Sequence, residues 1–398
     1  MTRAALTSVV LLVLVVPAAA HHGGGTFDGS RELKLTGTFT GLDLINPHSW
    51  IYFDVTGSDG KVTKYRCEMR AATVLRRSGW RPEMFKKGER LTVEGSPDRN
   101  DPTSCYLNTI VFADGKRVDR YGQLTTGTPL TALTATKRAT RRPSGEPNIS
   151  GDWAPEQLVM TDPRGRGGAL VPLSTVDRFK PGEGRIGGPR GAGRGGPRVI
   201  QGAELTPAGE KGAEQFAVLF DKNNPRMRCE TTSIIFDWAF DGPVNRITQN
   251  RDTIVLQYGQ LGFTRTIHTN LKAHPATIKP SRAGHSIGRW ENDVLIVETV
   301  GFAPGVLSPP ILNSDQLRVV ERFSLDSEKM LLTRSYTAED PVYFKGQFTG
   351  SDVIGVADLP YKPDPCKELG FLDYSNETKK EEPLQLRRSR APSLRQAN

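Results

Sequence analysis

The sequence predicts a mostly β protein: a small OB-like barrel followed by a larger antiparallel β-barrel or sandwich domain, with disordered insertions. Two observations support this fold class. The 398 residues include 41 Gly and 28 Pro and are only 36% hydrophobic, which is typical of short strands joined by many turns. Short stretches in which apolar and polar residues alternate also recur along the chain, and this alternation is the period of a half-buried strand.

Residues 21–123 are expected to form the small barrel. Gly57 to Gly60 has the composition of a hairpin turn. One short helix is expected from Ala71 to Ser78, ended by Gly79. Five or six short strands with one helix in about 90 residues are the proportions of an OB-like barrel. The strands are expected near residues 35–39, 50–55, 64–69, 90–95 and 107–112.

Residues 124–147 are rich in Thr, Ala, Pro and Arg without periodicity, so we expect a linker. A β-rich domain over residues 148–370 should follow. Its segment 164–202 is rich in Gly, Arg and Pro and too polar to pack, which predicts a long loop or a disordered insertion. Residues 371–398 are charged and lack apolar periodicity, so we expect a disordered tail.

The second domain should contain one helix and a meander of strands. The helix is expected from Leu205 to Phe220, because Thr206 can cap it and Pro207 suits its first position. Meandering antiparallel strands favour a sandwich or an up-and-down barrel. The strands are expected at residues 253–258, 263–267, 294–299, 317–323 and 329–336.

Residues 1–20 have the features of a signal peptide. Arg3 is the only charge before an apolar run at residues 9–16, and small residues follow at Ala18 to Ala20. The run is too short to span a bilayer. We therefore expect a periplasmic or secreted protein without a membrane span, whose mature chain begins at His21.

Export also predicts the state of the four cysteines. An even number of cysteines in an oxidising compartment favours disulfides, and the absence of a Cys-x-x-Cys pair argues against a structural zinc site. Pairing within each domain is the simplest of the three connectivities. It joins Cys67 to Cys105 and Cys229 to Cys366.

The formal net charge of +9 is concentrated in two segments. Seven arginines lie between Arg164 and Arg198, and four more lie in the tail after residue 386. We expect both segments to be solvated rather than to bind nucleic acid, because the protein is exported and the aromatic residues of a single-strand binder are not interleaved with them. The expected partner is a small molecule or a metal ion, and the sequence does not identify a protein partner.

The first domain resembles a family of secreted bacterial proteins known only as a domain of unknown function. Cys67 departs from the family pattern. The resemblance implies export and a domain boundary, but no activity. Its motifs are Ala20-His21-His22, Phe27-Asp28, Leu35-Thr36-Gly37-Thr38, Asn46-Pro47-His48, Leu75-Arg76-Arg77-Ser78-Gly79-Trp80 and Lys87-Gly88-Glu89, in this order.

The second unit looks like another uncharacterised bacterial segment, and this resemblance implies no activity either. Its marks are Asn148 to Trp153, Leu205-Thr206-Pro207, Cys229, Gly284 to Asp293, Val320-Glu321-Arg322-Phe323 and Asp340-Pro341.

Three of the six histidines form a candidate metal site, namely His21, His22 and His48. A mature N-terminal His21 offers its amine and its imidazole, and a third nitrogen from His48 would complete a planar site that favours copper as Cu(II). The alternative is that the two N-terminal histidines are a frayed terminus and that His48 is a turn residue bonded to backbone.

A second cluster surrounds His285. This residue could act as a general acid or base, with Arg289 binding an anion and Glu291 close by. The same stretch also reads as a hairpin with Trp290 packed beneath an exposed turn, which is the favoured interpretation. Glu298 and Glu321 lie on separate expected strands, either as paired carboxylates in a barrel or, as we favour, as ordinary outward-facing residues.

The sequence therefore favours an exported soluble binding module for a metal ion or small ligand, with no identifiable catalysis. The alternative is a periplasmic enzyme that acts on a small molecule, with His285 as general acid or base in the second domain. No serine-hydrolase elbow occurs where a strand meets a helix, and the Gly-rich segment lacks the features of a phosphate-binding loop.

Overall fold

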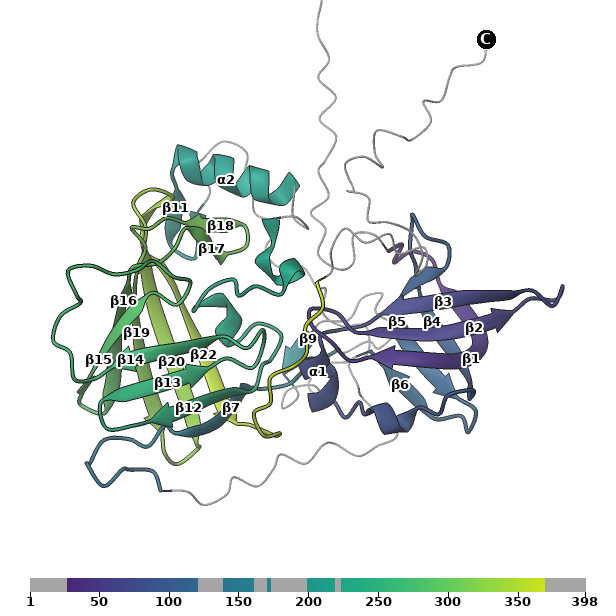
Figure 1. Cartoon of the computed structure of the whole chain (residues 1–398), viewed down its shortest axis with the longest axis horizontal. Helices are drawn as coiled ribbons and strands as arrows, with labels where there is room; N and C mark the ends of the chain where they lie inside the picture. Colours follow the sequence, from purple (N-terminus) through teal and green to yellow (C-terminus); the bar gives the residue numbers. More distant parts are fainter. Residues whose placement is uncertain (1–26, 121–138, 161–169, 173–198, 219–222, 369–398) are drawn as a thin grey trace, which may run out of the picture.

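The computed structural model describes residues 27–120, 139–160, 170–172, 199–218 and 223–368. Two β-barrels lie side by side, and the longer helix, α2 (Pro207–Val218), lies at one end of the larger barrel (Figure 1). The expected fold class is confirmed: the protein is mostly β, with a small barrel followed by a larger one. None of the helices in the described ranges has the length and hydropathy needed to cross a bilayer.

The N-terminal barrel has the strand order of an OB-fold. The first strand pairs with both the second and the fourth, and a parallel pairing between the third and the fifth closes the barrel. A short helix connects the third strand to the fourth, as in the expected OB-like fold. The elements are β1 (Leu33–Asp43), β2 (Trp50–Thr56), β3 (Val62–Glu68), α1 (Ala72–Arg77), η1 (Pro82–Met84), β4 (Arg90–Pro97), β5 (Ser104–Phe112) and β6 (Arg117–Asp119).

Local sequence explains these elements. β1 and β4 alternate exposed and buried residues over most of their length, as the sequence pattern predicts. Gly60 has φ +78° at the predicted hairpin turn, and Gly79 has φ +97° just beyond α1. Glycine reaches this left-handed region without steric cost, so Gly60 can form the hairpin turn and Gly79 can end the helix.

The larger barrel consists, within the described residues, of nine strands in the order β12-β13-β14-β15-β16-β19-β20-β22-β7. All neighbours are antiparallel except β14 and β15, which are parallel. The sequence left a sandwich and a barrel open, and the structure is a barrel. The strands are β7 (Gly151–Pro155), β12 (Asn245–Gln249), β13 (Thr253–Gln257), β14 (Thr264–His268), β15 (His285–Glu291), β16 (Val294–Val300), β19 (Arg318–Asp326), β20 (Leu331–Glu339) and β22 (Phe348–Val356).

Four charged side chains balance one another inside this barrel. Arg265 and Arg334 are each 1% exposed, and Glu321, which is fully buried, lies between them and forms an ion pair with both. Arg334 also pairs with Asp352, and its guanidinium donates to the carbonyl of Ile234 at 2.8 Å. Glu321 therefore does not face outward as we expected. On β19 the residues at 319, 321 and 323 are the buried ones, so Glu321 shares the inner face with two apolar neighbours.

The smaller elements pack around the two barrels. The predicted helix is present as α2, and Thr206 caps it by accepting a hydrogen bond from the Gly209 amide at 3.1 Å. The remaining strands and short helices are β8 (Leu158–Met160), β9 (Leu170–Pro172), β10 (Val199–Ile200), β11 (Ala203–Leu205), η3 (Pro225–Arg228), η4 (Phe236–Trp238), β17 (Gly305–Ser308), β18 (Ile311–Asn313) and β21 (Phe344–Gly346).

The described parts of the expected insertion at 164–202 contain two short strands, β9 and β10. β9 pairs with β8, and β10 pairs with β11, because backbone pairing does not require the apolar periodicity that the sequence lacks. The described part of the linker, residues 139–147, contacts the larger barrel, where Arg141 pairs with Asp293. The expected signal peptide, the tail and much of the insertion lie outside the described residues.

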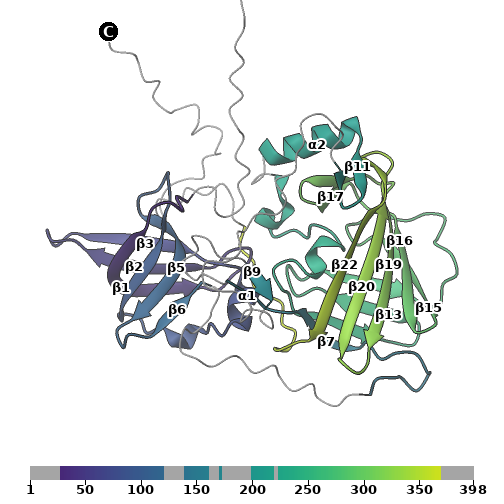
Figure 2. The same cartoon turned by 180° about the vertical axis from the view of Figure 1, so that it is seen from behind.

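The last described segment, residues 357–368, is here called the C-terminal strap. It lies between the two barrels in both views (Figures 1 and 2). Its backbone bonds to Asn46 of the first barrel: the Asn46 amide donates to the Pro365 carbonyl at 2.9 Å, and the Lys367 amide donates to the Asn46 carbonyl at 3.0 Å. The structure contains disulfides Cys67–Cys105 and Cys229–Cys366, and the second joins η3 to this strap.

Candidate functional site

Two sequence motifs of the first barrel lie where the barrels meet. In the first, Asn46-Pro47-His48, Asn46 is fully buried against the strap. In the second, the Arg77 guanidinium donates to three acceptors beyond the first barrel: Asp358 at 2.9 Å, the Gly242 carbonyl at 2.8 Å and the Pro155 carbonyl at 2.7 Å. Residues of both motifs therefore form hydrogen bonds that hold the first barrel against the rest of the protein.

His48 forms a close pair with Glu68 at this junction. Its Nδ1 lies 2.6 Å from Oε1 of Glu68, and the two side chains are 23% and 9% exposed. The local fold explains the contact, because His48 lies just before β2 and Glu68 ends β3 opposite Trp50 of β2. Burial disfavours a charged ring, but the Glu68 carboxylate outweighs burial and raises the pKa of His48 above its ordinary value.

Three further charged side chains extend this pair into the second domain. Arg70 lies 3.6 Å from Asp241, and Arg226 approaches the same carboxylate at 3.9 Å. Arg226 also pairs with the buried Asp237 at 2.5 Å. We call His48, Glu68, Arg70, Arg226 and Asp241 the junction cluster. It combines an imidazole, two carboxylates and two guanidinium groups from both domains.

The described chain begins near the junction cluster. Phe27 forms an isolated bridge with Asp98, and its ring lies 5.3 Å from that of Tyr106. Tyr106 in turn is the register partner of Glu68 in the parallel β3–β5 pairing. His21 and His22, the other expected metal ligands, lie outside the described residues.

The structure pairs His285 with other histidines. Its Nδ1 lies 2.8 Å from Nδ1 of His274, and its ring stacks on His268 with centroids 5.1 Å apart. Burial, together with the neighbouring imidazoles, lowers the pKa of His285. Sequence reasoning missed His268 and His274, because the parallel β14–β15 pairing that brings His268 to His285 leaves no signal in the local pattern.

The other catalytic candidates do not join His285. Arg289 and Glu291 form an exposed pair at 2.5 Å beside the hairpin turn, while the half-exposed Glu298 pairs with Arg318 at 3.0 Å. Glu321 lies inside the barrel, on the opposite face of the wall from His285. Trp290 packs partly buried against the core, as the hairpin interpretation predicts.

The described residues contain no group of three or more His, Cys, Asp or Glu side chains placed to hold a metal ion. In the histidine group of the larger barrel, two Nδ1 atoms instead face each other at hydrogen-bond distance. A metal site that uses the junction cluster therefore needs a ligand from outside the described residues.

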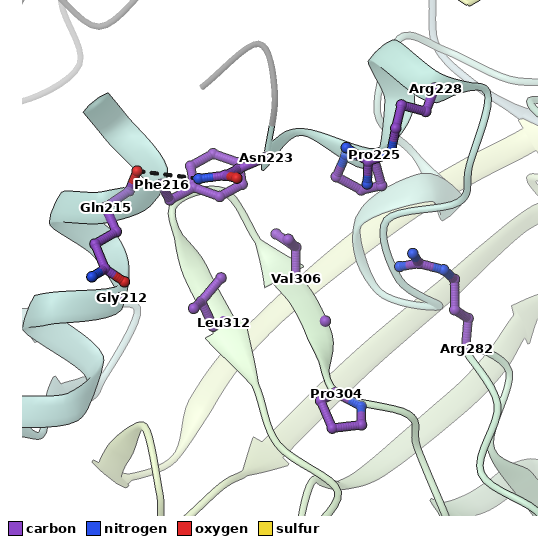
Figure 3. Close-up of a pocket in the computed structure, with 11 residues that line it drawn as sticks. Gly212, Gln215, Phe216, Asn223, Pro225, Arg228, Arg282, Pro304, Val306 and Leu312 are labelled. Atoms are coloured by element: carbon purple, nitrogen blue, oxygen red, sulfur yellow. Dashed lines mark hydrogen bonds between the residues drawn. The ribbon is translucent and has the colours of Figure 1, made fainter. Parts of the chain in front are cut away.

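A pocket of about 410 Å³ opens elsewhere, beside α2 and η3 (Figure 3). Sequence reasoning missed it, because its walls come from four segments that are distant in the chain. Its lining residues are Gly212, Gln215, Phe216, Asn223, Pro225, Arg228, Arg282, Pro304, Gly305, Val306 and Leu312.

The raised pKa of His48 predicts a pH effect on stability. A raised folded pKa gives stability that is fully present below the ordinary value of 6.5 and is lost as the pH rises through the folded value. The difference in unfolding free energy between wild type and His48→Gln should therefore shrink from pH 6.5 upward. Urea unfolding at a series of pH values measures it, and Glu68→Gln should abolish the trend. If the difference in unfolding free energy is the same at every pH, Glu68 does not stabilise the protonated ring of His48.

Comparison with known proteins identifies only the first domain. No curated protein matches the chain. A family model matches residues 9–106, and its description is a family of unknown function (DUF6152). The match covers His48, Glu68 and Arg77, and it confirms the expected resemblance. Residues 9–106 are thus similar to a family of unknown function (DUF6152), and a second domain built as a larger β-barrel follows them in the chain.

Proposed function

We propose that the protein is an exported binding module for a metal ion, with copper as Cu(II) bound at the junction cluster. His48 supplies one imidazole nitrogen. The amine and imidazole of a mature N-terminal His21 supply two more, and His22 lies next to them in the chain. Three nitrogen ligands in a planar arrangement suit Cu(II).

The contact between His48 and Glu68 carries this proposal. Metal-binding histidines usually donate their second ring N–H to a carboxylate, which fixes the ring and its tautomer. Oε1 of Glu68 lies 2.6 Å from Nδ1 of His48, so a carboxylate is present on the side of the ring where such a partner is needed. Nε2 of the ring has no hydrogen-bond partner among the described residues and is the nitrogen that would bind the metal.

The position of Phe27 makes the N-terminal ligands reachable. Five residues lie between His21 and Phe27, and the six steps from one Cα atom to the next span up to about 20 Å when the chain is extended. Phe27 contacts Tyr106, which is paired with Glu68. A chain leading back from Phe27 is therefore long enough to return to His48.

The disulfides support export. Disulfides persist in oxidising compartments and are rare in the cytosol, and this chain has two. The features of residues 1–20 agree with a periplasmic or secreted location. The alternative enzyme function has weaker support, because His285 faces the imidazole of His274 rather than a carboxylate that would orient a general base.

Copper titration tests the proposal. The protein that begins at His21 should bind one Cu(II), measured by calorimetry and by the EPR spectrum of nitrogen-ligated copper. Glu68→Gln should weaken binding by about 10–100-fold, the usual effect of removing a carboxylate behind a ligand. His48→Ala and an added Met before His21 should weaken it further, because each removes a direct ligand. Affinity should also rise with pH, since the raised pKa of His48 lets protons compete.

His285→Gln is the matched control, because it removes an imidazole that lies outside the junction cluster. It should leave copper affinity unchanged. Equal affinity in wild type, His48→Ala and the Met-extended form would show that the junction does not bind copper. Loss of binding in His285→Gln alone would place the metal on the larger barrel instead.

A further inference from the structure

The segment that connects β14 to β15, residues 269–284, is here called the crossover segment. The two strands are parallel, so the segment has to lead from the end of one to the start of the other. Near its first end the Thr269 amide donates to the Asp252 carbonyl at 2.9 Å, and near its second end the Ser281 amide donates to the Gly301 carbonyl at 3.2 Å. Backbone hydrogen bonds therefore hold both ends of the segment on the larger barrel.

A pair of histidines holds the middle of the crossover segment. Residues 270–277 are all exposed except His274. Within the described part of the chain, His274 is also the one residue of this stretch with a hydrogen bond to the barrel, which joins its Nδ1 to Nδ1 of His285 on β15 at 2.8 Å. The two rings meet edge to face, with centroids 5.0 Å apart.

The geometry of this pair determines where its hydrogens lie. Two neutral imidazoles carry two N–H hydrogens, and one of these must lie between the facing Nδ1 atoms. Nε2 of His274 is buried and has no hydrogen-bond partner among the described residues. A buried N–H without an acceptor is costly. We therefore assign the donating Nδ1–H to His274, which leaves its Nε2 bare, and the second hydrogen to Nε2 of His285.

An added proton does not fit this arrangement. A third hydrogen has to go to Nε2 of His274 if the bond between the rings is kept, and that buried atom has no acceptor among the described residues. A fourth hydrogen would occupy both facing Nδ1 atoms and break the bond. Proton uptake therefore favours separation of the two rings.

The surrounding groups also disfavour a charged pair. Burial lowers the pKa of both His274 and His285, and the imidazoles of His274 and His268 lower the pKa of His285 further. Glu298 of β16 favours a charged His274, but Arg318 of β19 opposes this and pairs with the same carboxylate at 3.0 Å. His268 of β14 stacks on His285, so a charged His285 would lie against another imidazole.

We propose that the pair formed by His274 and His285 is an acid-sensitive latch on the crossover segment. Near neutral pH the latch is uncharged and holds residues 270–277 against the larger barrel. In acid it takes up protons, the rings separate, and the segment is released from the His285 ring. The latch lies outside the junction cluster and is independent of the proposed metal binding.

The direction of the pKa shifts gives the pH range of release. A histidine whose folded pKa is lowered stabilises the closed latch fully above the ordinary value of 6.5, and this stabilisation is lost as the pH falls through the folded value. The ratio of released to held segment should therefore rise below pH 6.5, by up to about tenfold per pH unit for each proton taken up on release.

A nitroxide spin label on Ala276→Cys in the full-length mature protein reports the release. Its EPR spectrum should show a restricted label at about pH 8 and a mobile label at about pH 5. A label on Ser58→Cys, in the exposed turn between β2 and β3 of the first barrel, should give the same spectrum at both pH values. Equal mobility at position 276 at both pH values would overturn the proposal, as would a release that coincides with loss of near-UV circular dichroism.

His274→Ala should leave the label at position 276 mobile at both pH values, because the bond to His285 is gone. His268→Gln is the matched control, since it removes an imidazole that touches His285 but supplies neither facing nitrogen. It should keep the acid response. An acid response that persists in His274→Ala would contradict the latch. Nitrogen NMR of the unaltered protein tests the assigned tautomer, and a hydrogen on Nε2 of His274 near neutral pH would overturn it.

Discussion

Glu321→Gln should destabilise the protein by about 3–5 kcal/mol, because breaking a buried ion pair leaves an uncompensated charge. Glu321 is fully buried between Arg265 and Arg334 inside the larger barrel. Burial disfavours the charge of Arg265, but the carboxylate outweighs it and raises the pKa of that guanidinium. A guanidinium group does not lose its proton in a protein, so both arginines stay charged when the carboxylate is removed. Among the described residues, Asp352 beside Arg334 is then the remaining carboxylate in this group.

The matched control is Glu298→Gln on the neighbouring strand. Glu298 also pairs with an arginine, Arg318, but the two side chains are 31% and 45% exposed. Pairs at the surface contribute about 0–1 kcal/mol, so this variant should be close to wild type. Urea unfolding compares the two. Similar midpoints for Glu321→Gln and Glu298→Gln would show that the interior of the barrel is solvated enough to screen the charges.

Replacing both Cys229 and Cys366 with serine should cost about 5 kcal/mol in the chain-entropy account, in which a longer closed loop gives a larger effect. The two cysteines are 137 residues apart. Their disulfide also fastens the C-terminal strap, whose backbone bonds to Asn46 of the first barrel. Its loss should therefore loosen the strap before it unfolds either barrel.

The Cys67–Cys105 disulfide provides the comparison. It closes a separation of only 38 residues, for which the same account gives about 4 kcal/mol. Urea unfolding of both double-serine variants measures the loss of global stability. Limited proteolysis of the strap measures its local loosening. We expect early cleavage near residues 357–368 in Cys229→Ser/Cys366→Ser only. Early cleavage there in both variants would contradict a specific role for Cys229–Cys366.

Local patterns predicted the fold class because most strands pair with their neighbours in the chain. The alternation in β4 and the turn at Gly60 determine their elements without reference to distant residues. β7 and β12 were missed because they contain few β-branched or aromatic residues, whereas the equally short β13 and β14 contain three each and were predicted. Closure of the larger barrel by β7 depends on pairings far apart in sequence, which no local window contains.

The candidate sites were harder to predict for the same reason. His48 was predicted only as a metal ligand or a turn residue. Its contact with Glu68 was not expected, because that contact depends on the β2–β3 register. Glu321 looked like an ordinary exposed residue. It lies inside the barrel because the odd-numbered residues of β19 from 319 to 323 face inward. The pocket at Arg282 gave no signal, because charged residues in loops have no periodicity.

The position of β7 also affects when this protein can fold. β7 begins at Gly151, yet it pairs with β22, which ends at Val356, as well as with β12. A chain that is synthesised or translocated from its N-terminus has an open edge on this sheet until about two hundred more residues have followed β7. Pairings so distant in sequence form slowly, whereas the five strands of the first barrel are complete by Phe112. The first barrel can therefore fold while the rest of the chain is still extended, and closure of the second is among the last steps.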